Sequence, residues 1–398
     1  MIVLIVSIAH FCDLQGGMPR IVRDESAELL RRGDDVWVLA PGSSSQPEHE
    51  IDDGVHLLRY VAGRVASWNP ARRSAHQKAA KAVLEKYLPR VDAIHGHAPL
   101  PYLAALNLYG DSVQTSYTIH SPAKMEMAIV WKQAGLLRRI SSPIGQAVIN
   151  RMERECLLRS RVVTALSQYT IACIGRMHGD EIAGKVQLLL GWVESSRFVP
   201  VENRNEAKRQ LGWPTDVPIL FTLRRLSPRM GLDRLIEAGY KLAGEGIRFH
   251  LMIGGTGPLR KSLEARSRAL GLGDVMTFLG RVDEDKLPLA YAACDAFVLP
   301  TAELECFGLI ALEALSAGRP VLATPVGSIP EIVGKFEPAW ISRSPAAESI
   351  ADLLREYLSG GQIGHTAAQL HEKARREYGQ ERLLPLFVDA TVRSGADA

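Results

Sequence analysis

Short apolar runs alternate with stretches of helical periodicity along almost the whole chain, and this alternation limits the fold more than any other feature. In the N-terminal half, candidate strands lie at 2–7, 36–40, 55–60, 92–95, 113–118, 162–166 and 186–189. Candidate helices lie at 17–32, 72–88, 99–109, 145–159 and 168–177. Apolar strands that alternate with helices are typical of a parallel sheet covered on both faces. The sequence therefore predicts an α/β fold.

The rhythm breaks at 191–218, a stretch with several prolines, and then begins again. Further candidate strands lie at 218–223, 248–253, 275–279, 296–299 and 320–323. Candidate helices of this half lie at 206–212, 231–244, 258–270, 284–293 and 307–317. The chain of 398 residues is long enough for two such halves.

We predict two Rossmann-like domains, an acceptor-side domain at 1–195 and a donor-binding domain at 196–375. A C-terminal helix at about 376–398 is expected to pack back on the first domain. In open parallel sheets, ligands bind at the carboxyl ends of the strands. We therefore expect the two domains to face each other across a cleft.

Two glutamates, Glu305 and Glu313, are eight residues apart in a segment expected to become helical after Phe307. A helical advance of eight residues turns about 800°, roughly 80° past two full turns, and rises about 12 Å. The carboxylates then point to roughly one side, separated by about the length of a sugar-diphosphate-ribose. Ionised carboxylates accept hydrogen bonds from hydroxyl groups. By itself the pair is equally consistent with a solvated helix face.

Two arginines, Arg225 and Arg229, lie between the strand at 218–223 and the helix at 231–244. The guanidinium fork grips phosphate oxygens in bidentate fashion. Cations at a helix start would stabilise a leaving diphosphate electrostatically, which is usually the largest catalytic contribution in such reactions. Another glycine turn, which includes Gly255, follows the strand at 248–253.

Gly16 and Gly17 join the first strand to the first helix. Glycines allow the backbone to approach a phosphate, and a helix N-terminus supplies amide donors and partial positive charge. The loop contains neither Gly-x-Gly-x-x-Gly nor Gly-Lys-Ser/Thr, so it is not a dinucleotide fingerprint or a Walker loop. A simple tight turn is the alternative interpretation.

His120 lies just beyond the strand at 113–118, and a position at the carboxyl end of a strand favours a functional role over a structural one. His95 and His97 form a similar but weaker pair, for which a structural role is favoured. Their spacing alone does not indicate a metal site. The five cysteines show no Cys-x2-Cys spacing and are odd in number, so they indicate neither zinc nor a disulfide framework.

The net charge of +3 argues against a dedicated nucleic-acid binder. Basic residues are concentrated in two stretches: 59–90 holds eight of them and one acidic residue, and 131–161 holds seven and two. Two interpretations stay open, namely the solvated faces of amphipathic helices or a surface for an anionic membrane or acceptor. No apolar stretch reaches the ~18 residues of a transmembrane helix. We expect a cytoplasmic protein, with peripheral contact at the inner membrane face as the second option.

The motifs resemble those of the retaining glycosyltransferases of family four, which have the GT-B fold. The resemblance spans nearly the whole chain. In the first half it includes Gly16-Gly17, Glu28-Leu-Leu-Arg-Arg-Gly33, Asp92-Ala-Ile-His-Gly-His97, Thr118-Ile-His120 and Gly191-Trp-Val-Glu-Ser-Ser-Arg-Phe198. In the second half it includes Arg225-Leu-Ser-Pro, Gly254-Gly-Thr-Gly-Pro, Phe278-Leu-Gly-Arg281, Glu305-x7-Glu313, Ala317-Gly-Arg-Pro-Val and Gly327-Ser-Ile-Pro-Glu331. The order and spacing are specific for the family and uninformative about the substrate.

The resemblance implies catalytic roles for Arg225, Arg229, Glu305 and His120. Arg225 would hold the diphosphate with help from Gly17 amides, Glu305 would contact hydroxyls of the donor sugar, and His120 would lie near the donor sugar and the acceptor. Donor-binding roles would fall to Gly16, Gly17, Gly255, Arg281, Val282, Phe307, Gly308, Leu309 and Glu313. Glu313 would bind the ribose, and the turn at Arg281 and Val282 would lie at the base. No metal and no cofactor are implied.

One departure concerns Met230, at a position where the family usually has Lys. Arg229 is one residue away, but a neighbouring residue points elsewhere, and the substitution is not conservative. The Asn that usually precedes the Gly-Val-Asp motif of the family is also replaced, here by Gly191 and Trp192.

We expect transfer of a hexose-type sugar from a UDP- or GDP-linked donor to a hydroxyl of a glycan, a lipid-linked or a small-molecule acceptor, with retention of configuration. The alternatives are a catalytically idle GT-B scaffold subunit, suggested by Met230, and a GT-B sugar phosphorylase. A nicotinamide-dependent dehydrogenase is disfavoured because the glycine fingerprint is absent.

Overall fold

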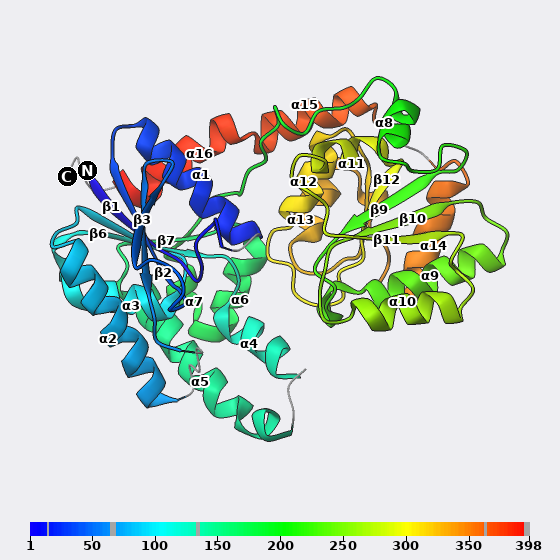
Figure 1. Cartoon of the computed structure of the whole chain (residues 1–398). Helices are drawn as coiled ribbons and strands as arrows, with labels where there is room; N and C mark the ends of the chain where they lie inside the picture. Colours follow the sequence, from blue (N-terminus) through cyan, green and yellow to red (C-terminus); the bar gives the residue numbers. More distant parts are fainter. Residues whose placement is uncertain (14–15, 64–68, 133–135, 362–363, 394–398) are drawn as a thin grey trace. The chain divides into compact units, whose positions relative to one another are not determined.

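The computed structural model describes residues 1–13, 16–63, 69–132, 136–361 and 364–393 (Figure 1). They form two compact units. Unit 1 consists of Met1–Gly191 and the C-terminal Arg382–Ala398, and unit 2 consists of Trp192–Glu381. Residues 64–68 and 133–135 of the two basic stretches, and 394–398 of the predicted C-terminal helix, lie outside the described residues. Within the described ranges, no helix combines the length and the apolar character needed to cross a membrane.

Unit 1 contains an eight-stranded sheet in the order β3-β4-β2-β1-β5-β6-β7-β8 (Figure 1). Its strands are β1 (Ile2–Val6), β2 (Asp35–Pro41), β3 (His49–Asp52), β4 (Val55–Tyr60), β5 (Ala93–Gly96), β6 (Gln114–Ile119), β7 (Val162–Ala165) and β8 (Val186–Leu188). Neighbouring strands are parallel except β3 and β4, which form an antiparallel edge hairpin. Strand β3 was not predicted, because this short, partly exposed strand has no apolar run.

The helices of unit 1 cover both faces of a sheet whose central strands are almost wholly apolar and buried. They are α1 (Gly17–Arg31), α2 (Pro70–Tyr87), α3 (Pro99–Tyr109), α4 (Ala123–Lys132), α5 (Leu136–Arg159), α6 (Gln168–His178) and α7 (Asp180–Ala183), with a short 3-10 turn, η1 (Gly110–Ser112). Helix α4 was not predicted, and α5 begins nine residues before the predicted helix at 145–159.

The C-terminal end of the chain belongs to unit 1. Helix α16 (Gln380–Val388) leads into a π-helical turn, η4 (Asp389–Arg393), which packs against β5, β6 and β7. The Phe387 ring lies 5.5 Å from the His95 ring, and Arg393 donates to Asp34 at 2.6 Å. These last residues therefore complete the core of unit 1.

Unit 2 contains a five-stranded, fully parallel sheet in the order β11-β10-β9-β12-β13 (Figure 1). Its strands are β9 (Ile219–Leu223), β10 (His250–Gly254), β11 (Met276–Gly280), β12 (Ala296–Leu299) and β13 (Val321–Ala323). Each predicted strand of this half is confirmed to within two residues at either end. Phe221 of β9 pairs in register with Phe297 of β12 and Met252 of β10, at the centre of the buried core.

The helices of unit 2 are α8 (Arg204–Gln210), α9 (Leu232–Gly244), α10 (Arg260–Ala269), α11 (Leu287–Ala293), α12 (Leu309–Ser316), α13 (Ile329–Phe336), α14 (Ala347–Leu358) and α15 (Ala367–Tyr378). Two 3-10 turns, η2 (Pro228–Met230) and η3 (Pro338–Trp340), complete the unit. Helix α9 buries an apolar stripe of Leu235, Ile236, Ala238 and Leu242, and its outer face is polar. The α/β prediction is confirmed in both units: the sheet of unit 2 is parallel, the sheet of unit 1 is parallel except for the hairpin of β3 and β4, and helices connect most successive strands.

Candidate active site

The carboxyl ends of all five strands of unit 2 meet at one edge of its sheet, because the strands are parallel. Arg224 follows β9, Gly255 follows β10, Arg281 follows β11, and the loop to Glu305 follows β12. Backbone hydrogen bonds join these loops: Arg224 N–H donates to Gly254 O at 3.0 Å, and Gly255 N–H donates to Gly280 O at 2.6 Å. Most of the residues predicted to bind a donor therefore lie at this edge.

Glu305 is held by a buried arginine that the sequence analysis did not select. Arg224 Nη2 donates to Glu305 Oε2 at 2.6 Å, and its Nη1 donates to the Thr301 hydroxyl. The Arg224 side chain is 4% exposed and the Glu305 side chain 16%. Because a guanidinium in this position fixes one carboxylate oxygen, the other is the oxygen that can accept bonds from a ligand.

The backbone at Glu305 is fixed as firmly as its side chain. Ser328 N–H and Oγ–H both donate to Glu305 O, at 2.8 and 3.2 Å. Gly327 has a φ of +66°, and a Cβ built there would lie 2.0 Å from Glu305 O. Only glycine permits this approach, because any side chain would push the Glu305 carbonyl away.

The two arginines predicted to bind diphosphate have different surroundings. Arg225 is exposed, and within the part of the chain that the structure describes its guanidinium makes no hydrogen bond or ion pair. Arg229 is half-buried, and its Nη1 donates to Leu304 O at 2.8 Å. Leu304 has a φ of +53°, which is uncommon for a residue with a side chain. Arg229 thus supports the loop that carries Glu305, and Arg225 is the cation open to solvent.

Glu305 and Glu313 are not related by one continuous helix, so the predicted helical advance between them is wrong. Helix α12 begins at Leu309, and Gly308 at its N-cap has a left-handed φ of +85°. Glu305 therefore lies in the preceding loop, because the left-handed residue ends the helical geometry before it reaches Phe307. Glu313 lies within α12 and is 4% exposed.

Three other predicted donor-binding residues lie at the same edge. Gly255 has a φ of +116°, and a Cβ built there would lie 1.8 Å from Arg224 O. Its amide already donates to Gly280 O, so close packing rather than phosphate binding explains this glycine. Arg281 is exposed and Val282 is half-buried, directly after β11.

In unit 1, Gly16 and Gly17 lie at the start of α1, where both are exposed. Gly16 is the N-cap and offers no side chain to the first turn, so the amides of that turn stay open to a ligand. Residues 14–15 of this loop lie outside the described residues.

Three histidines and one glutamate form a connected network at the carboxyl ends of β5 and β6. Glu25, on the buried face of α1, has its Oε1 2.5 Å from His95 Nδ1 and its Oε2 3.0 Å from His97 Nε2. His97 Nδ1 lies 2.7 Å from His120 Nε2. His120 is half-buried and directly follows β6. The structure therefore connects the predicted His120 to the two histidines that the sequence favoured as structural.

Burial and hydrogen bonding shift the pKa values in this network. Burial by itself would raise the pKa of Glu25, but the attraction and hydrogen bonds of His95 and His97 outweigh it and lower the pKa to about 2. Burial lowers the pKa of His97 to about 4, with a further contribution from His95. Burial, together with His97, also holds the pKa of His120 well below its usual value. At neutral pH, Glu25 is ionised, and His97 and His120 are uncharged.

Glu25, His95 and His97 are residue types that bind zinc, and their ligand atoms lie within 4.8 Å of one another. In this network, however, each carboxylate oxygen of Glu25 faces one imidazole nitrogen at hydrogen-bonding distance. The arrangement is explained by hydrogen bonding alone.

Glu25 and Arg224 were not predicted as site residues, although the sequence around each contains a signal. Glu25 lies on the helix face of Ile21 and Leu29, four residues from each, where a charged residue needs a buried partner. Arg224 precedes Arg225 in the same loop, so the two could not be distinguished without knowing which side chain turns inward. A distant partner, Glu305, decides that direction.

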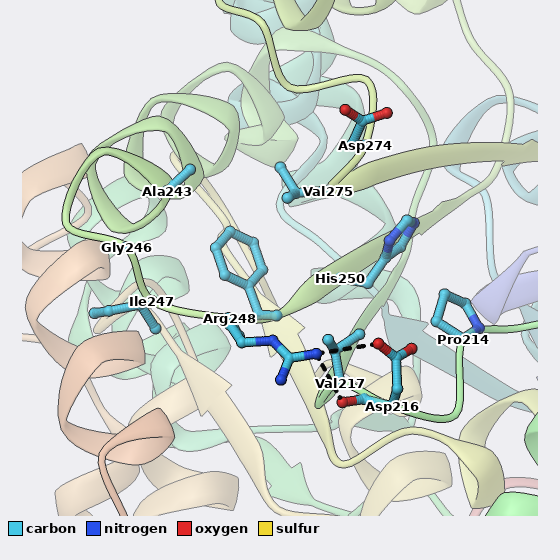
Figure 2. A pocket seen from close by; sticks show the side chains of 11 residues that line it. Pro214, Asp216, Val217, Ala243, Gly246, Ile247, Arg248, His250, Asp274 and Val275 are labelled. Carbon is cyan, nitrogen blue, oxygen red and sulfur yellow. Dashed lines mark hydrogen bonds and ion pairs between the residues drawn. The ribbon is translucent and has the colours of Figure 1, made fainter.

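A separate pocket of unit 2 carries none of the predicted site residues. It lies at the amino ends of β10 and β11, where the lining includes Arg248, His250 and Asp274 (Figure 2). Arg248 points toward Asp216 and donates to its carboxylate at 3.1 Å. This pocket is at the sheet edge opposite to the strand-end loops, and its arginine is already paired.

Two family models match the chain. The model described as Glycosyltransferase Family 4 matches residues 15–188, and the model described as Glycosyl transferases group 1 matches residues 203–377.

Relatives and solved structures agree with the family models. A D-inositol 3-phosphate glycosyltransferase of Actinosynnema mirum is 26% identical over 92% of this chain and 93% of its own length. A GDP-mannose-dependent alpha-(1-6)-phosphatidylinositol monomannoside mannosyltransferase of Mycobacterium tuberculosis is 29% identical over 54% of this chain and 56% of its own. The sucrose-phosphate synthase structure from Thermosynechococcus elongatus has a TM-score of 0.82 and 21% identity, and covers 100% of this chain and 99% of that one.

The two Rossmann-like units, the matched models and these relatives define a glycosyltransferase of the GT-B fold. The chain belongs to glycosyltransferase family four.

Proposed function

We propose that the protein transfers a hexose-type sugar from a nucleotide-diphosphate donor to a hydroxyl of its acceptor, with retention of the anomeric configuration. The observation that carries this proposal is the combination, in one set of loops, of the fixed carboxylate Glu305 and the exposed cation Arg225. A carboxylate is suited to sugar hydroxyls and a guanidinium to a diphosphate. The GDP-mannose dependence of the mycobacterial relative supports a donor of this class.

In the proposed reaction, the bond between the anomeric carbon and the diphosphate oxygen breaks while the acceptor hydroxyl attacks from the same face. The acceptor proton passes to the leaving diphosphate, so no enzyme carboxylate has to act as nucleophile. Arg225 stabilises the negative charge that develops on the diphosphate. Arg224, Thr301 and Arg229 keep the Glu305 loop in place for the sugar hydroxyls. No bound metal and no cofactor take part in this scheme.

A thermal-shift screen identifies the nucleotide of the donor. Purified protein is heated with UDP- and GDP-linked sugars, and the true donor is expected to raise the melting temperature, since a ligand at 100 times its Kd adds about 2.7 kcal/mol. Release of the nucleotide diphosphate, first without and then with candidate glycan, lipid-linked and small-molecule acceptors, then measures turnover. A donor that binds but is neither hydrolysed nor transferred would instead support a catalytically idle scaffold.

Two glutamine variants test the assignment of the carboxylates. Glu305→Gln is expected to weaken binding of the nucleotide sugar and to leave binding of the free nucleotide diphosphate nearly unchanged. Glu313→Gln is expected to weaken both, because its proposed partner is the ribose. Glu303→Gln, at an exposed position of the same loop, is the matched control. Calorimetry showing the opposite pattern for Glu305 and Glu313 would reverse the orientation of the donor.

A further inference from the structure

Two chains of hydrogen bonds, here called arms, begin at the carboxylate of Glu25. One arm runs from Glu25 through His97 to His120. The other runs from Glu25 through His95 to the hydroxyls of Thr118 and Thr164, with distances of 2.8 Å and 2.7 Å. All members except His120 are buried. The first arm thus leads from a buried charge to the half-buried side chain at the end of β6.

The direction of each hydrogen bond in the first arm follows from its starting point. Ionised Glu25 can only accept, so the proton at His97 lies on Nε2. An uncharged imidazole carries one proton, and therefore His97 Nδ1 is an acceptor. His120 Nε2, 2.7 Å away, must then be the donor. His120 is uncharged as well, so its remaining nitrogen, Nδ1, carries a lone pair.

We propose that Glu25 and His97 are positioning residues that hold His120 in the Nε2–H tautomer, so that His120 Nδ1 accepts a hydrogen bond from a hydroxyl of a sugar substrate. Among the described residues, His120 Nδ1 has no hydrogen-bond partner, as a ligand-facing atom requires. This inference rests on the proposed function, because a sugar hydroxyl is the ligand group it names.

The tautomer selects the chemistry of the ligand. A hydroxyl can donate to a lone pair on nitrogen, whereas an ionised phosphate oxygen offers only lone pairs and would be repelled. His120 in this form therefore recognises a hydroxyl and does not bind the diphosphate. That task is left to guanidinium and backbone amide groups, which are donors only.

The tautomer can be measured without any substrate. In protein labelled with 15N at histidine, long-range nitrogen–proton correlation spectra distinguish protonated from unprotonated ring nitrogens, and the His120→Asn variant assigns the His120 signals. The wild type is expected to show one His120 tautomer at pH 7, with the proton on Nε2. A His120 that is protonated on Nδ1, on both nitrogens, or in a mixture of tautomers would overturn the proposal.

Two variants separate the arms. His97→Phe removes the acceptor for His120 Nε2 and is expected to release His120 into a mixture of tautomers. Thr118→Val, a matched change of similar shape in the other arm, should leave the His120 spectrum unchanged. If His97→Phe leaves the single tautomer intact, His97 does not position His120. Should His97→Phe fail to fold, the wild-type spectrum and the His120 variants described next still decide the proposal.

Kinetics test the recognition of a hydroxyl. His120→Asn keeps an acceptor near the place of Nδ1 and should retain more activity than His120→Ala, which removes it. His97→Phe should lower kcat/KM by about 2- to 10-fold relative to Thr118→Val, as the loss of one hydrogen bond predicts. Equal activity of His120→Asn and His120→Ala, or unchanged kinetics in a His97→Phe protein that has lost its single tautomer, would overturn the recognition.

The source of the hydroxyl is given by comparing two reactions of the same variants. If donor hydrolysis and transfer fall together in His97→Phe, the hydroxyl belongs to the donor sugar; if transfer alone falls, it belongs to the acceptor. Both results support hydroxyl recognition. A wild type that hydrolyses and transfers no nucleotide sugar would refute the proposed function, whereas the tautomer spectrum would still test the positioning by Glu25 and His97.

Discussion

The two units use the same sheet-and-helix plan but place opposite kinds of chemistry at the carboxyl ends of their strands. In unit 1 the groups are imidazoles around one buried carboxylate, and two of those imidazoles are uncharged at neutral pH. In unit 2 the groups are guanidinium groups and carboxylates. Arg224 is paired with Glu305, and the Arg225 side chain is exposed. Because the backbone plan is shared, the difference lies in the side chains that the strands, loops and helix α1 place at this edge of each sheet.

The comparison also separates two ways of holding a site residue. His120 is oriented through a relay of hydrogen bonds that begins at a buried helix residue, Glu25. Glu305 is oriented by direct contacts from two neighbouring loops, one with Arg224 and the other with Gly327 and Ser328. The first arrangement depends on the protonation state of every member, and the second on loop geometry.

Removal of the C-terminal segment should unfold unit 1 and leave unit 2 folded. A chain that ends at Glu381 loses Phe387 and Val388, which are 1% and 0% exposed, and the ion-pair partners of Arg32 and Asp34. The loss of even one large buried side chain costs about 2–5 kcal/mol. Hydrogen exchange should show protection lost in β1 and β5 and kept in β9 and β12.

A chain that ends after Arg393 is the control for this truncation, because it keeps every contact just named. Native protection of β5 in the shorter chain would show that the segment from Arg382 onward is dispensable for unit 1.

Arg225 and Arg224 should fail in different ways when replaced by alanine. Arg225→Ala is expected to lower kcat by about 100-fold or more, as the loss of a transition-state donor typically does, without a change in melting temperature. Arg224→Ala should lower both activity and stability, since it leaves Glu305 without its buried partner. Arg229→Ala should lower kcat less than Arg225→Ala, because its guanidinium bonds to Leu304 O.

Steady-state kinetics and thermal melts of the three alanine variants, with Arg225→Lys as the charge-preserving control, separate these effects. Near-wild-type turnover of both Arg225→Ala and Arg229→Ala would refute the assignment of the diphosphate site.

The sequence predicted the alternating strands and helices well because the core strands are apolar throughout. The strand Val55–Tyr60 and the strand Ala296–Leu299 have the predicted bounds. The edge strand His49–Asp52 escaped detection because its pairing with β4, rather than an apolar run, makes it a strand. Local periodicity therefore predicts buried elements and misses those that depend on a partner.

The same limit applies to the candidate sites. The positions of Glu305, Arg225 and His120 after strands were visible in the sequence, because each lies within six residues of the end of an apolar run. The choice of Arg224 as the partner of Glu305 depends on a contact across 81 residues of sequence. The link from Glu25 to His97 spans 72 residues. No local pattern specifies such pairs, although a charge on an apolar helix face does signal that one is needed.

A lower pH should decrease the stability of unit 1, because two of its buried histidines are uncharged in the folded protein. Burial lowers the pKa of His10 and of His97 from 6.5 to about 4, so between these values the unfolded chain binds protons that the folded chain does not. The contribution of these two histidines to the free energy of unfolding is therefore fully present above pH 6.5. It falls as the pH drops toward 4, by up to about 1.4 kcal/mol per pH unit for each histidine. Glu25, with its pKa lowered to about 2, adds a second loss below pH 4.5.

Urea unfolding at several pH values measures this dependence, and His10→Gln isolates one contribution. His10 Nε2–H donates to Leu58 O at 2.9 Å, and the side-chain amide of glutamine can replace this donor. Glutamine does not titrate. The variant should therefore lose less stability than the wild type between pH 7 and pH 5. An equal loss in both proteins would show that His10 does not contribute.

The smallest expected effect comes from adding the charge that the family usually has at Met230. Met230 ends the 3-10 turn η2 and is 8% exposed, and lysine has an unbranched stem of similar length. Met230→Lys should tighten binding of a nucleoside diphosphate by about fivefold or less, the range of a partly exposed ion pair, and more so at low salt. Calorimetry at two salt concentrations, with Met230→Gln as the uncharged control, measures the change.

If Met230→Lys and Met230→Gln bind the nucleoside diphosphate equally at both salt concentrations, this position does not reach the diphosphate. Arg225 would then remain the only cation assigned to that ligand, and the contrast with the uncharged edge of unit 1 would rest on Arg225 together with the Arg224–Glu305 pair.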